Sequence, residues 1–333
     1  MNSLYIHIPF CKSKCHYCDF VSYAGKEELI EKYIDSLILS LDSARDILLP
    51  RGEGLATVYF GGGTPSLLSP TQLNRILSSL TSHLSSHAEI SLEANPATAD
   101  YEKLKAFREL GVNRLSVGAQ TFIDKHLKVL GRIHSAEDIY QFYNDARRAG
   151  FTNIGIDLIF ALPNQTFSEW KKDVEEVLKF NPEHISIYNL EIKKKSHLSS
   201  LVSHLPDNDT EADMFEFAIE SLKQAGYKHY EISNFAKPGF KCQHNLAYWQ
   251  NKNYLGIGTG AHSHINKGSA ADRQETIFMG LRLIDGIEKE KFEGFEKEVA
   301  ELINDGLLKE NGKNYKLTQK GIMLGNLAFA QFV

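Results

Sequence analysis

The chain has 333 residues, a mass of 37.5 kDa and a net charge of -5, with 42% hydrophobic residues and nine prolines. This composition supplies enough apolar surface for a large core and excludes a disordered or collagen-like chain. The net negative charge gives no general basic surface for binding nucleic acid. No stretch approaches the roughly 18 consecutive apolar residues of a membrane-spanning helix. The N-terminal residues lack the basic and apolar regions of an export signal, so we expect a cytoplasmic protein.

Short β-rich runs alternate with helix-length segments along most of the chain. Ser69 before Pro70 is typical of a helix N-terminus, and Ser135 with Asp138 resembles a capping box. This alternation predicts an α/β protein with a parallel sheet, either curved into a partial barrel or left open. The expected strands are 4–8, 57–60, 89–94, 114–119, 153–160 and 184–190.

Polar residues recur at the carboxyl ends of these strands, where parallel α/β proteins bind their ligands. A cysteine-rich loop follows the first strand, and a triple glycine follows the second. Later strands carry or end at Glu93, Gln120, Asp157 and the run 188–191. An acidic residue within an apolar strand costs stability unless its charge is shared. These residues therefore predict a ligand site at one rim of the sheet.

Three of the four cysteines, Cys11, Cys15 and Cys18, form the pattern C-x3-C-x2-C. Three thiolates on one short loop can converge as ligands of a metal or an iron-sulfur cluster, and a disulfide framework is not expected in a reducing compartment. A zinc site would need a fourth ligand such as His7 or His16 and lacks a second cysteine pair. Chance clustering is the remaining alternative. A four-iron cluster is favoured, because three cysteines leave one iron open for chemistry.

The cysteine loop with Tyr17 before its last cysteine resembles the signature of radical S-adenosylmethionine (SAM) proteins. The triple glycine at 61–63 fits a tight turn or a close backbone approach to a ligand, and no phosphate-loop lysine follows it. The chain further resembles the HemN/HemW branch of that superfamily. The motifs that carry this resemblance are YIHIPFC at 5–11, GGGTPS at 61–66, SLEANP at 91–96, RLSVGAQTF at 114–122 and IGIDLIFALPNQT at 154–166.

The resemblance implies a partial (β/α)6 barrel over residues 1–265, with a heme-motif segment at about 230–265. It implies a 4Fe-4S cluster on the three cysteines and SAM on the open iron. Arg132 would pair with the SAM carboxylate as a forked cation. The residues implied to contact SAM are Tyr5, Tyr17, Gly62, Gly63, Thr64, Glu93, Gln120, Arg132 and Asp157.

The branch holds a heme chaperone and an oxygen-independent coproporphyrinogen III dehydrogenase. The dehydrogenase carries a fourth cysteine where this chain has Phe20, and a longer segment before its cysteine loop, so the chaperone is favoured. The chain also contains the H-N-x-x-Y-W pattern associated with heme binding in the chaperone. The implied heme residues are His244, Asn245, Tyr248 and Trp249. For His244, a packed and hydrogen-bonded side chain is the alternative to an axial ligand.

The C-terminal part is expected to form a small separate domain over residues 276–333. Its pattern of helix, helix, hairpin and helix resembles a winged helix, and its nearly balanced charges favour packing or partner docking over DNA binding. In the family, several tens of residues separate the A-H-S motif from the GLRL motif. Here 261–263 and 280–283 are joined by a short connection. We expect this difference to affect substrate access more than cluster or SAM binding.

We therefore expect a protein that binds a 4Fe-4S cluster, SAM and heme, and delivers heme to apo-proteins such as respiratory cytochromes. No catalytic residue is assigned. The alternative is a dehydrogenase in which an adenosyl radical abstracts hydrogen from propionate side chains during oxidative decarboxylation. No nucleic-acid partner is expected, and the sequence leaves the oligomeric state and any peripheral membrane contact open.

Overall fold

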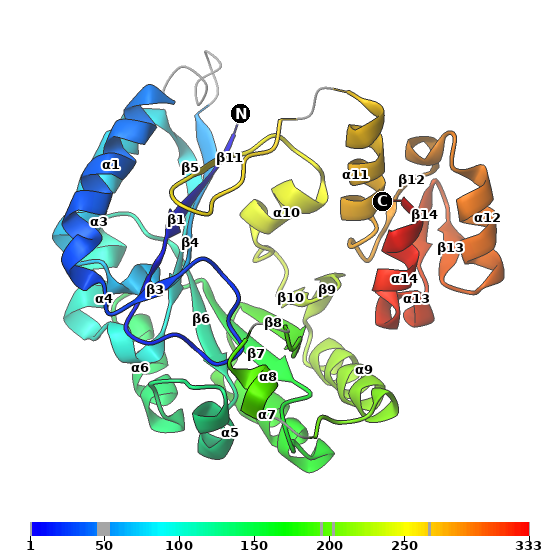
Figure 1. Cartoon of the computed structure of the whole chain (residues 1–333), viewed down its shortest axis with the longest axis horizontal. Helices are drawn as coiled ribbons and strands as arrows, with labels where there is room; N and C mark the ends of the chain where they lie inside the picture. The colour runs from blue at the N-terminus through cyan, green and yellow to red at the C-terminus, as the bar shows by residue number, and fades with distance from the viewer. Residues whose placement is uncertain (1, 45–53, 194–195, 202–203, 266–267, 333) are drawn as a thin grey trace.

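A computed structural model describes residues 2–44, 54–193, 196–201, 204–265 and 268–332 (Figure 1). Nine strands form one sheet in the order β11-β1-β4-β5-β6-β7-β8-β10-β9. The order begins and ends with different strands, so the curved sheet stays open, as a partial barrel requires. The fold class expected from the sequence is confirmed.

The six expected strands are parallel neighbours in chain order. Their interior positions are buried on both faces, which is typical of a parallel sheet covered by helices. Their bounds are β1 (Ser3–Ile8), β4 (Leu55–Gly62), β5 (Leu84–Ala94), β6 (Arg114–Gln120), β7 (Ile154–Phe160) and β8 (His184–Asn189). Three short strands extend the edges: β11 (Leu255–Ile257) pairs parallel to β1, and β10 (Asn234–Ala236) and β9 (Lys228–Glu231) add antiparallel beyond β8.

Helices between the strands cover the outer face of the sheet (Figure 1). They are α1 (Ile30–Ser43), α3 (Pro70–Leu80), α4 (Tyr101–Glu109), α5 (Asp124–Val129), α6 (Ala136–Arg148) and α7 (Phe167–Phe180). Ser69 caps α3 and Ser135 caps α6 in a capping box, as the sequence predicted, and Ser69 also forms a capping box with Gln72. Thr166 caps α7 in the same way. The later helices α8 (Leu198–Leu201), α9 (Asn208–Gln224) and α10 (Gln243–Trp249) follow β8.

The main core lies between the sheet and these helices. On α1 the buried residues Ile30, Ile34, Leu37 and Leu41 recur at helical spacing and face the sheet. Each fully buried aliphatic side chain of this kind contributes about 1.5–3 kcal/mol. This packing holds the strands rigidly, so the residues at their carboxyl ends are presented at fixed positions.

A second buried cluster forms within the C-terminal segment, around Phe292, Leu302 and Phe332. Its elements are α11 (Ala270–Gly280), β12 (Ile287–Glu288), α12 (Glu296–Asn304), β13 (Leu308–Asn311), β14 (Asn314–Leu317), α13 (Gln319–Met323) and α14 (Gly325–Phe329). The order of helices and hairpin matches the expected pattern, but the final helix is divided in two at Leu324. The boundary of a separate domain at 276 stays a prediction.

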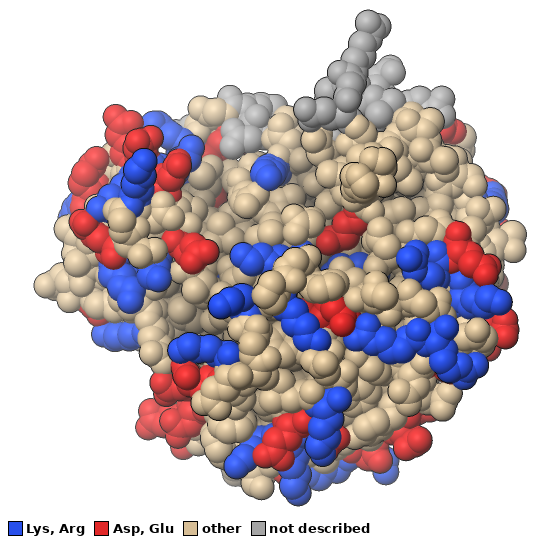
Figure 2. Space-filling view, turned by 180° about the vertical axis from the view of Figure 1, so that it is seen from behind, with Lys and Arg blue, Asp and Glu red and all other residues tan. Residues whose placement is uncertain are grey.

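Within the described residues, no helix is long and apolar enough to cross a membrane. On the face of the molecule shown in Figure 2, acidic side chains lie among the basic ones.

Candidate functional site

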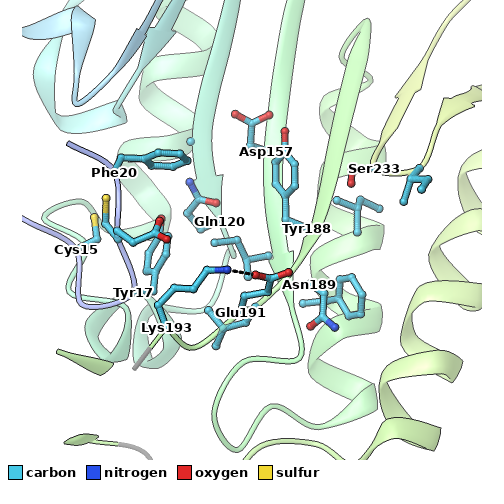
Figure 3. Close-up of a pocket in the computed structure, with 18 of the residues that line it drawn as sticks. Cys15, Tyr17, Phe20, Gln120, Asp157, Tyr188, Asn189, Glu191, Lys193 and Ser233 are labelled. Atoms are coloured by element: carbon cyan, nitrogen blue, oxygen red, sulfur yellow. Dashed lines mark hydrogen bonds and ion pairs between the residues drawn. The ribbon is translucent and has the colours of Figure 1, made fainter. Parts of the chain in front are cut away.

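A cavity of about 1050 Å³ lies at the carboxyl ends of the parallel strands. In Figure 3 the cysteine loop, with Cys15, Tyr17 and Phe20, lies across from Asp157 and Tyr188. The structure thus brings together residues that lie far apart in the chain. The predicted residues that line the cavity are Cys11, Cys15, Cys18, Tyr17, Gly62, Gly63, Thr64, Glu93, Gln120, Arg132 and Asp157, together with 188–191. Tyr5 is not among the lining residues.

The three thiols have an environment that suits cluster ligands. Cys11 accepts a hydrogen bond from Thr64 Oγ1 at 3.4 Å, and Cys15 accepts one from Arg132 Nη1 at 3.3 Å. Burial raises the pKa of the Cys11 and Cys18 thiols. A bound metal deprotonates a coordinating thiol outright, so the positive charge of iron would offset this burial. The donor set therefore fits a cluster with three cysteine ligands.

The two histidines considered as a fourth zinc ligand are engaged elsewhere. His7 accepts from Tyr5 at Nδ1 (3.0 Å) and donates from Nε2 to the Val21 carbonyl (2.8 Å). His16 Nδ1 donates to the Val129 carbonyl at 2.9 Å. Among the residues that the structure describes, no three His, Cys, Asp or Glu side chains converge as the ligands of one metal ion would.

The glycines after β4 are required by packing inside the protein. Gly62 has φ +110°, and a Cβ there would lie 2.4 Å from the His7 ring. A Cβ on Gly63 would lie 2.8 Å from the carbonyl oxygens of Ile8 and Phe10. No side chain fits at either position without a shift of the first strand. The same segment lines the cavity, so its backbone is also exposed to a ligand.

Two carboxylates face the cavity. Glu93 accepts hydrogen bonds from Tyr59 OH at 3.1 Å and from the Gly62 N–H at 3.0 Å. Burial, together with the charge of Asp157, raises the pKa of Glu93 to about 7. Asp157 accepts from Ser116 Oγ at 3.1 Å, and burial raises its pKa as well. A ligand that is cationic or donates hydrogen bonds would stabilise this pair, since each charge disfavours the other.

Gln120 and Arg132 border the same space. Gln120 has φ +70° at an irregularity in the pairing of β6 with β7, a conformation that costs a non-glycine residue about 1–3 kcal/mol. Arg132 Nη2 donates to the Gly118 carbonyl at 2.7 Å. Its buried Nε has no partner among the described residues. A guanidinium with a free donor is suited to a carboxylate ligand, and strain of this kind gathers at functional sites.

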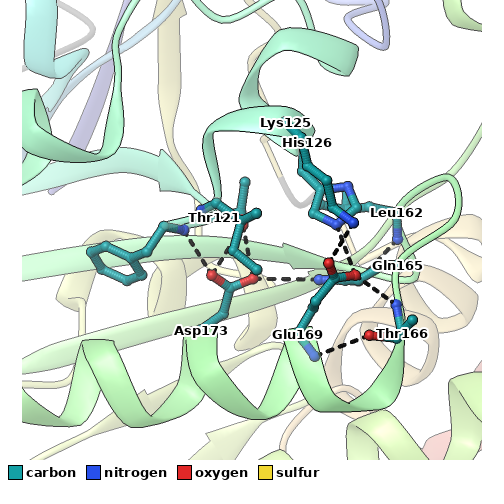
Figure 4. Close-up of polar contacts among 10 residues, drawn as sticks. Thr121, Lys125, His126, Leu162, Gln165, Thr166, Glu169 and Asp173 are labelled. Carbon is teal, nitrogen blue, oxygen red and sulfur yellow. Dashed lines mark hydrogen bonds and ion pairs between the residues drawn. The ribbon is translucent and has the colours of Figure 1, made fainter.

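A network that sequence reasoning missed supports the strained turn at Gln120 (Figure 4). Asp173 on α7 accepts from the Phe122 N–H at 2.7 Å, from Thr121 Oγ1 at 2.8 Å and from Gln165 Nε2 at 3.3 Å. Gln165 in turn accepts from the Leu162 N–H. One buried carboxylate thus joins the segments that follow β6 and β7.

The cavity also has an apolar wall that sequence reasoning missed. Most of this wall comes from the C-terminal segment, with Ile322, Met323, Leu324, Leu327 and Phe329, and Ile232 between β9 and β10 completes it. Arg282 lies on the same side of the cavity, with its guanidinium 4.4 Å from the Trp249 ring centroid. Its nearest acid is Glu231 at 3.8 Å, and its buried Nε has no partner among the described residues. A guanidinium with one unsatisfied donor therefore lies beside an apolar surface.

The histidine of the H-N-x-x-Y-W segment lies outside the lining of this cavity. His244 on α10 is 1% exposed. Its Nδ1 pairs with Thr57 Oγ1 and its Nε2 with Tyr248 OH, both at 2.8 Å. Its ring stacks on Tyr59 with a centroid distance of 5.1 Å. Both ring nitrogens are engaged in this conformation, so a role as heme ligand stays a prediction, as it does for Asn245.

Two family models cover most of the chain. Residues 5–177 match the Radical SAM superfamily, and residues 271–324 match the HemN C-terminal domain. The chain belongs to the radical SAM superfamily. Membership of this superfamily implies a 4Fe-4S cluster and SAM, in agreement with the three thiols and the polar side of the cavity.

Curated relatives place the chain in the HemN/HemW branch of the superfamily, and a solved structure shares its fold. The chain is 37% identical over 374 positions to the heme chaperone HemW of Lactococcus lactis, covering 100% of this chain and 97% of the relative. The heme chaperone HemW of Escherichia coli is 41% identical over 266 positions, covering 79% and 70%. The structure of coproporphyrinogen III oxidase (HemN) from Escherichia coli matches with a TM-score of 0.84 and 24% identity, over 99% of this chain and 89% of that one. That match shows a shared fold.

The short connection before the GLRL motif agrees with these alignments. The alignment to the Lactococcus lactis relative is longer than the 333-residue chain, so that radical SAM relative has residues without a counterpart here. On one side of the connection, His264 bridges to Tyr254, and on the other Ser269 caps α11. Residues 266 and 267 between them lie outside the described residues, so the position of the missing segment stays a prediction.

Proposed function

We propose that this chain is a heme chaperone that holds a 4Fe-4S cluster, SAM and heme, and passes the heme to acceptor apo-proteins such as respiratory cytochromes. The observation that carries the proposal is the two-sided cavity. One side presents three thiols with carboxylates and a guanidinium, and the other presents an apolar wall beside the guanidinium of Arg282. The names of the curated relatives support the heme part of the proposal.

The polar side suits the cluster and SAM. Cys11, Cys15 and Cys18 would hold the cluster, which when bound would supply the electron for reductive cleavage of SAM. Arg132, which lines the cavity, would pair with the SAM carboxylate through its guanidinium. Glu93, Gln120 and Asp157 would accept from or donate to the amino group and the ribose hydroxyls. Gly62, Gly63 and Thr64 would lie along the methionine part of SAM, with Tyr17 beside it. Tyr5 does not line the cavity and would lie behind these residues.

The apolar side suits a tetrapyrrole. A planar macrocycle buries a large apolar face, and the apolar wall offers aliphatic and aromatic side chains for it. Arg282 would pair with a propionate, because its side chain is 24% exposed and lines the cavity beside the apolar wall. Trp249 of the H-N-x-x-Y-W segment holds this guanidinium in place by stacking.

Ligation of heme iron by His244 would require a change in this structure. The imidazole would have to leave Thr57 or Tyr248, and each neutral hydrogen bond contributes about 0.5–1.5 kcal/mol. The free energy lost with one such hydrogen bond is small compared with the free energy gained from a bond between the imidazole and the heme iron. The prediction that His244 is the axial ligand therefore implies that α10 opens when heme binds.

A coproporphyrinogen dehydrogenase is the second candidate, and the fold shared with the oxidase HemN favours it. Phe20 distinguishes the two, because it occupies the place of a fourth cysteine, is 64% exposed and lines the cavity. An apolar ring at this position adds to the surface available to a macrocycle.

A transfer assay separates the two functions. The cluster-reconstituted protein is loaded with heme and mixed, without oxygen, with an apo-cytochrome, whose absorbance spectrum reports heme uptake. The same preparation is given SAM, a reductant and coproporphyrinogen III, and the porphyrin products are measured. Heme uptake without decarboxylation supports the chaperone, whereas decarboxylation without heme uptake supports the dehydrogenase and overturns the proposal.

A further inference from the structure

Inward-facing residues of β1, β4 and β5 form a layer directly below the cavity. Alternate residues of a strand share one face, so Thr57 and Tyr59 of β4 point the same way, as do Glu89 and Glu93 of β5. Tyr5 is the register partner of Tyr59 on β1. The layer thus reaches from the first turn of α10 to the carboxylate in the cavity.

Tyr59 connects the two ends of this layer. Its hydroxyl donates to Glu93 Oε1 at 3.1 Å, and its ring stacks on His244 at 5.1 Å with an interplanar angle of 24°. Tyr5 completes a cluster of three rings, with centroids 6.2 Å from Tyr59 and 6.4 Å from His244. Burial raises the pKa of Tyr59 well above its usual value, so the hydroxyl keeps its proton and acts as a donor.

His244 is fixed from several directions. Both ring nitrogens are hydrogen-bonded at 2.8 Å, and burial together with the positive charge of Arg114 lowers its pKa to about 3, which keeps the ring neutral. The backbone N–H groups of Gln243 and His244 donate to the Glu89 carboxylate at 3.1 and 3.2 Å. The strand that carries Glu93 therefore also anchors the helix that carries His244.

We propose that His244 is a positioning residue for the SAM site, because its ring holds Tyr59 in the orientation that donates to Glu93. The inference rests on the proposed function in one respect, since it takes Glu93 as a contact of SAM. Without the imidazole, the phenol ring of Tyr59 keeps only Tyr5 as a stacking partner and gains room to turn away on the side of α10. Glu93 would then keep only the Gly62 N–H, and its carboxylate would be free to leave the cavity.

The test measures the dissociation constant of SAM for the cluster-reconstituted protein by anaerobic equilibrium dialysis. The variants are Glu93→Gln, Tyr59→Phe, His244→Ala, His244→Phe and the double variant Tyr59→Phe/His244→Ala. Tyr254→Phe is the matched control, because Tyr254 contacts Tyr248 on α10, whereas the hydrogen-bond partners of Glu93 are Tyr59 and Gly62. Iron content and the thermal midpoint are measured for each variant, so that loss of fold is recognised.

We expect Tyr59→Phe and His244→Ala each to weaken SAM binding about tenfold, with Tyr254→Phe unchanged. The double variant should bind SAM no more weakly than Tyr59→Phe, because both changes remove the same hydrogen bond. His244→Phe keeps a ring against Tyr59 and should recover most of the affinity. A purely structural role of His244 would instead give additive losses and no recovery.

Two results would overturn the inference, and only the second would also overturn the assignment of Glu93 to the SAM site. If Glu93→Gln weakens SAM binding while Tyr59→Phe leaves it unchanged, the positioning role is wrong and the SAM site stands. If Glu93→Gln leaves SAM binding unchanged, the assignment of Glu93 to SAM is wrong as well. Tyr59→Phe removes a single oxygen atom, so this arm of the test does not depend on whether the His244 variants fold.

Discussion

The carboxylate of Asp173 accepts the backbone N–H of Phe122 at 2.7 Å, two residues beyond the left-handed Gln120. Asp173 is fully buried and belongs to α7, whereas Phe122 belongs to the turn after β6. Because Gln165 also donates to Asp173, the turn after β7 is held by the same side chain. Two neighbouring strand ends of the cavity thus depend on one acid.

Replacement of Asp173 by Asn tests this dependence through pH. Burial raises the pKa of Asp173 to about 7, above the value of about 3.9 in an unfolded chain. Between these values the folded protein binds more protons than the unfolded chain, so stability falls as pH rises from about 4 to 7. Wild type should lose on the order of 2–4 kcal/mol relative to Asp173→Asn over this range. Anaerobic urea unfolding at several pH values measures the free energy of unfolding of both proteins. If this free energy changes with pH equally in wild type and in Asp173→Asn, the account is contradicted.

Gln120→Gly should separate stability from binding. Glycine adopts φ +70° without a steric cost, so the free energy of unfolding should rise by about 1 kcal/mol. The amide that lines the cavity is lost, so SAM should bind more weakly. Urea unfolding and equilibrium dialysis report the two effects. A variant that is less stable than wild type would show that the left-handed turn carries no strain.

Cys15→Ala should abolish the cluster and leave the fold largely intact. Cys15 is only partly buried and lies on a loop outside the main core, so the lost thiol removes little packing. The broad visible absorbance of the reconstituted cluster should disappear, while the far-ultraviolet circular dichroism should remain. Retained iron-sulfur absorbance would refute the assignment of this ligand.

Arg282→Leu should weaken heme binding about tenfold or more, because a buried propionate loses its charge partner. Arg273→Leu is the control, since Arg273 lies on α11, is exposed and does not line the cavity. A heme titration followed by absorbance compares the two variants with wild type. Equal affinities for all three proteins would remove Arg282 from the heme site.

The strands and their polar ends could be predicted from the sequence because both signals are local. The apolar run around Asp157 and the cysteine spacing each lie within a few residues, and parallel pairing then brings the strand ends to one rim. Asp173 also left a local signal, since it stands on the buried face of α7 beside Trp170 and Val174. An acid on such a face requires buried donors, and the sequence does not show which ones.

The apolar wall and the position of His244 could not be predicted in the same way. Leu327 and Arg282 reach the cavity through the packing of the C-terminal segment against β9 and β10, which depends on contacts between residues far apart in the chain. His244 follows a motif that resembles a ligand site, but its hydrogen bond to Thr57 spans 187 positions. Long-range partners of this kind decide whether an imidazole is free or satisfied.

A heme titration of the cluster-reconstituted protein under anaerobic conditions tests the central claim most directly. Absorbance at the Soret band is followed as heme is added, and the titration is repeated with SAM present. The account predicts saturation at a single heme per chain, since the apolar wall and Arg282 lie together on one side of the cavity. A signal that rises without saturation would show that the cavity holds no specific heme site and would contradict the chaperone function.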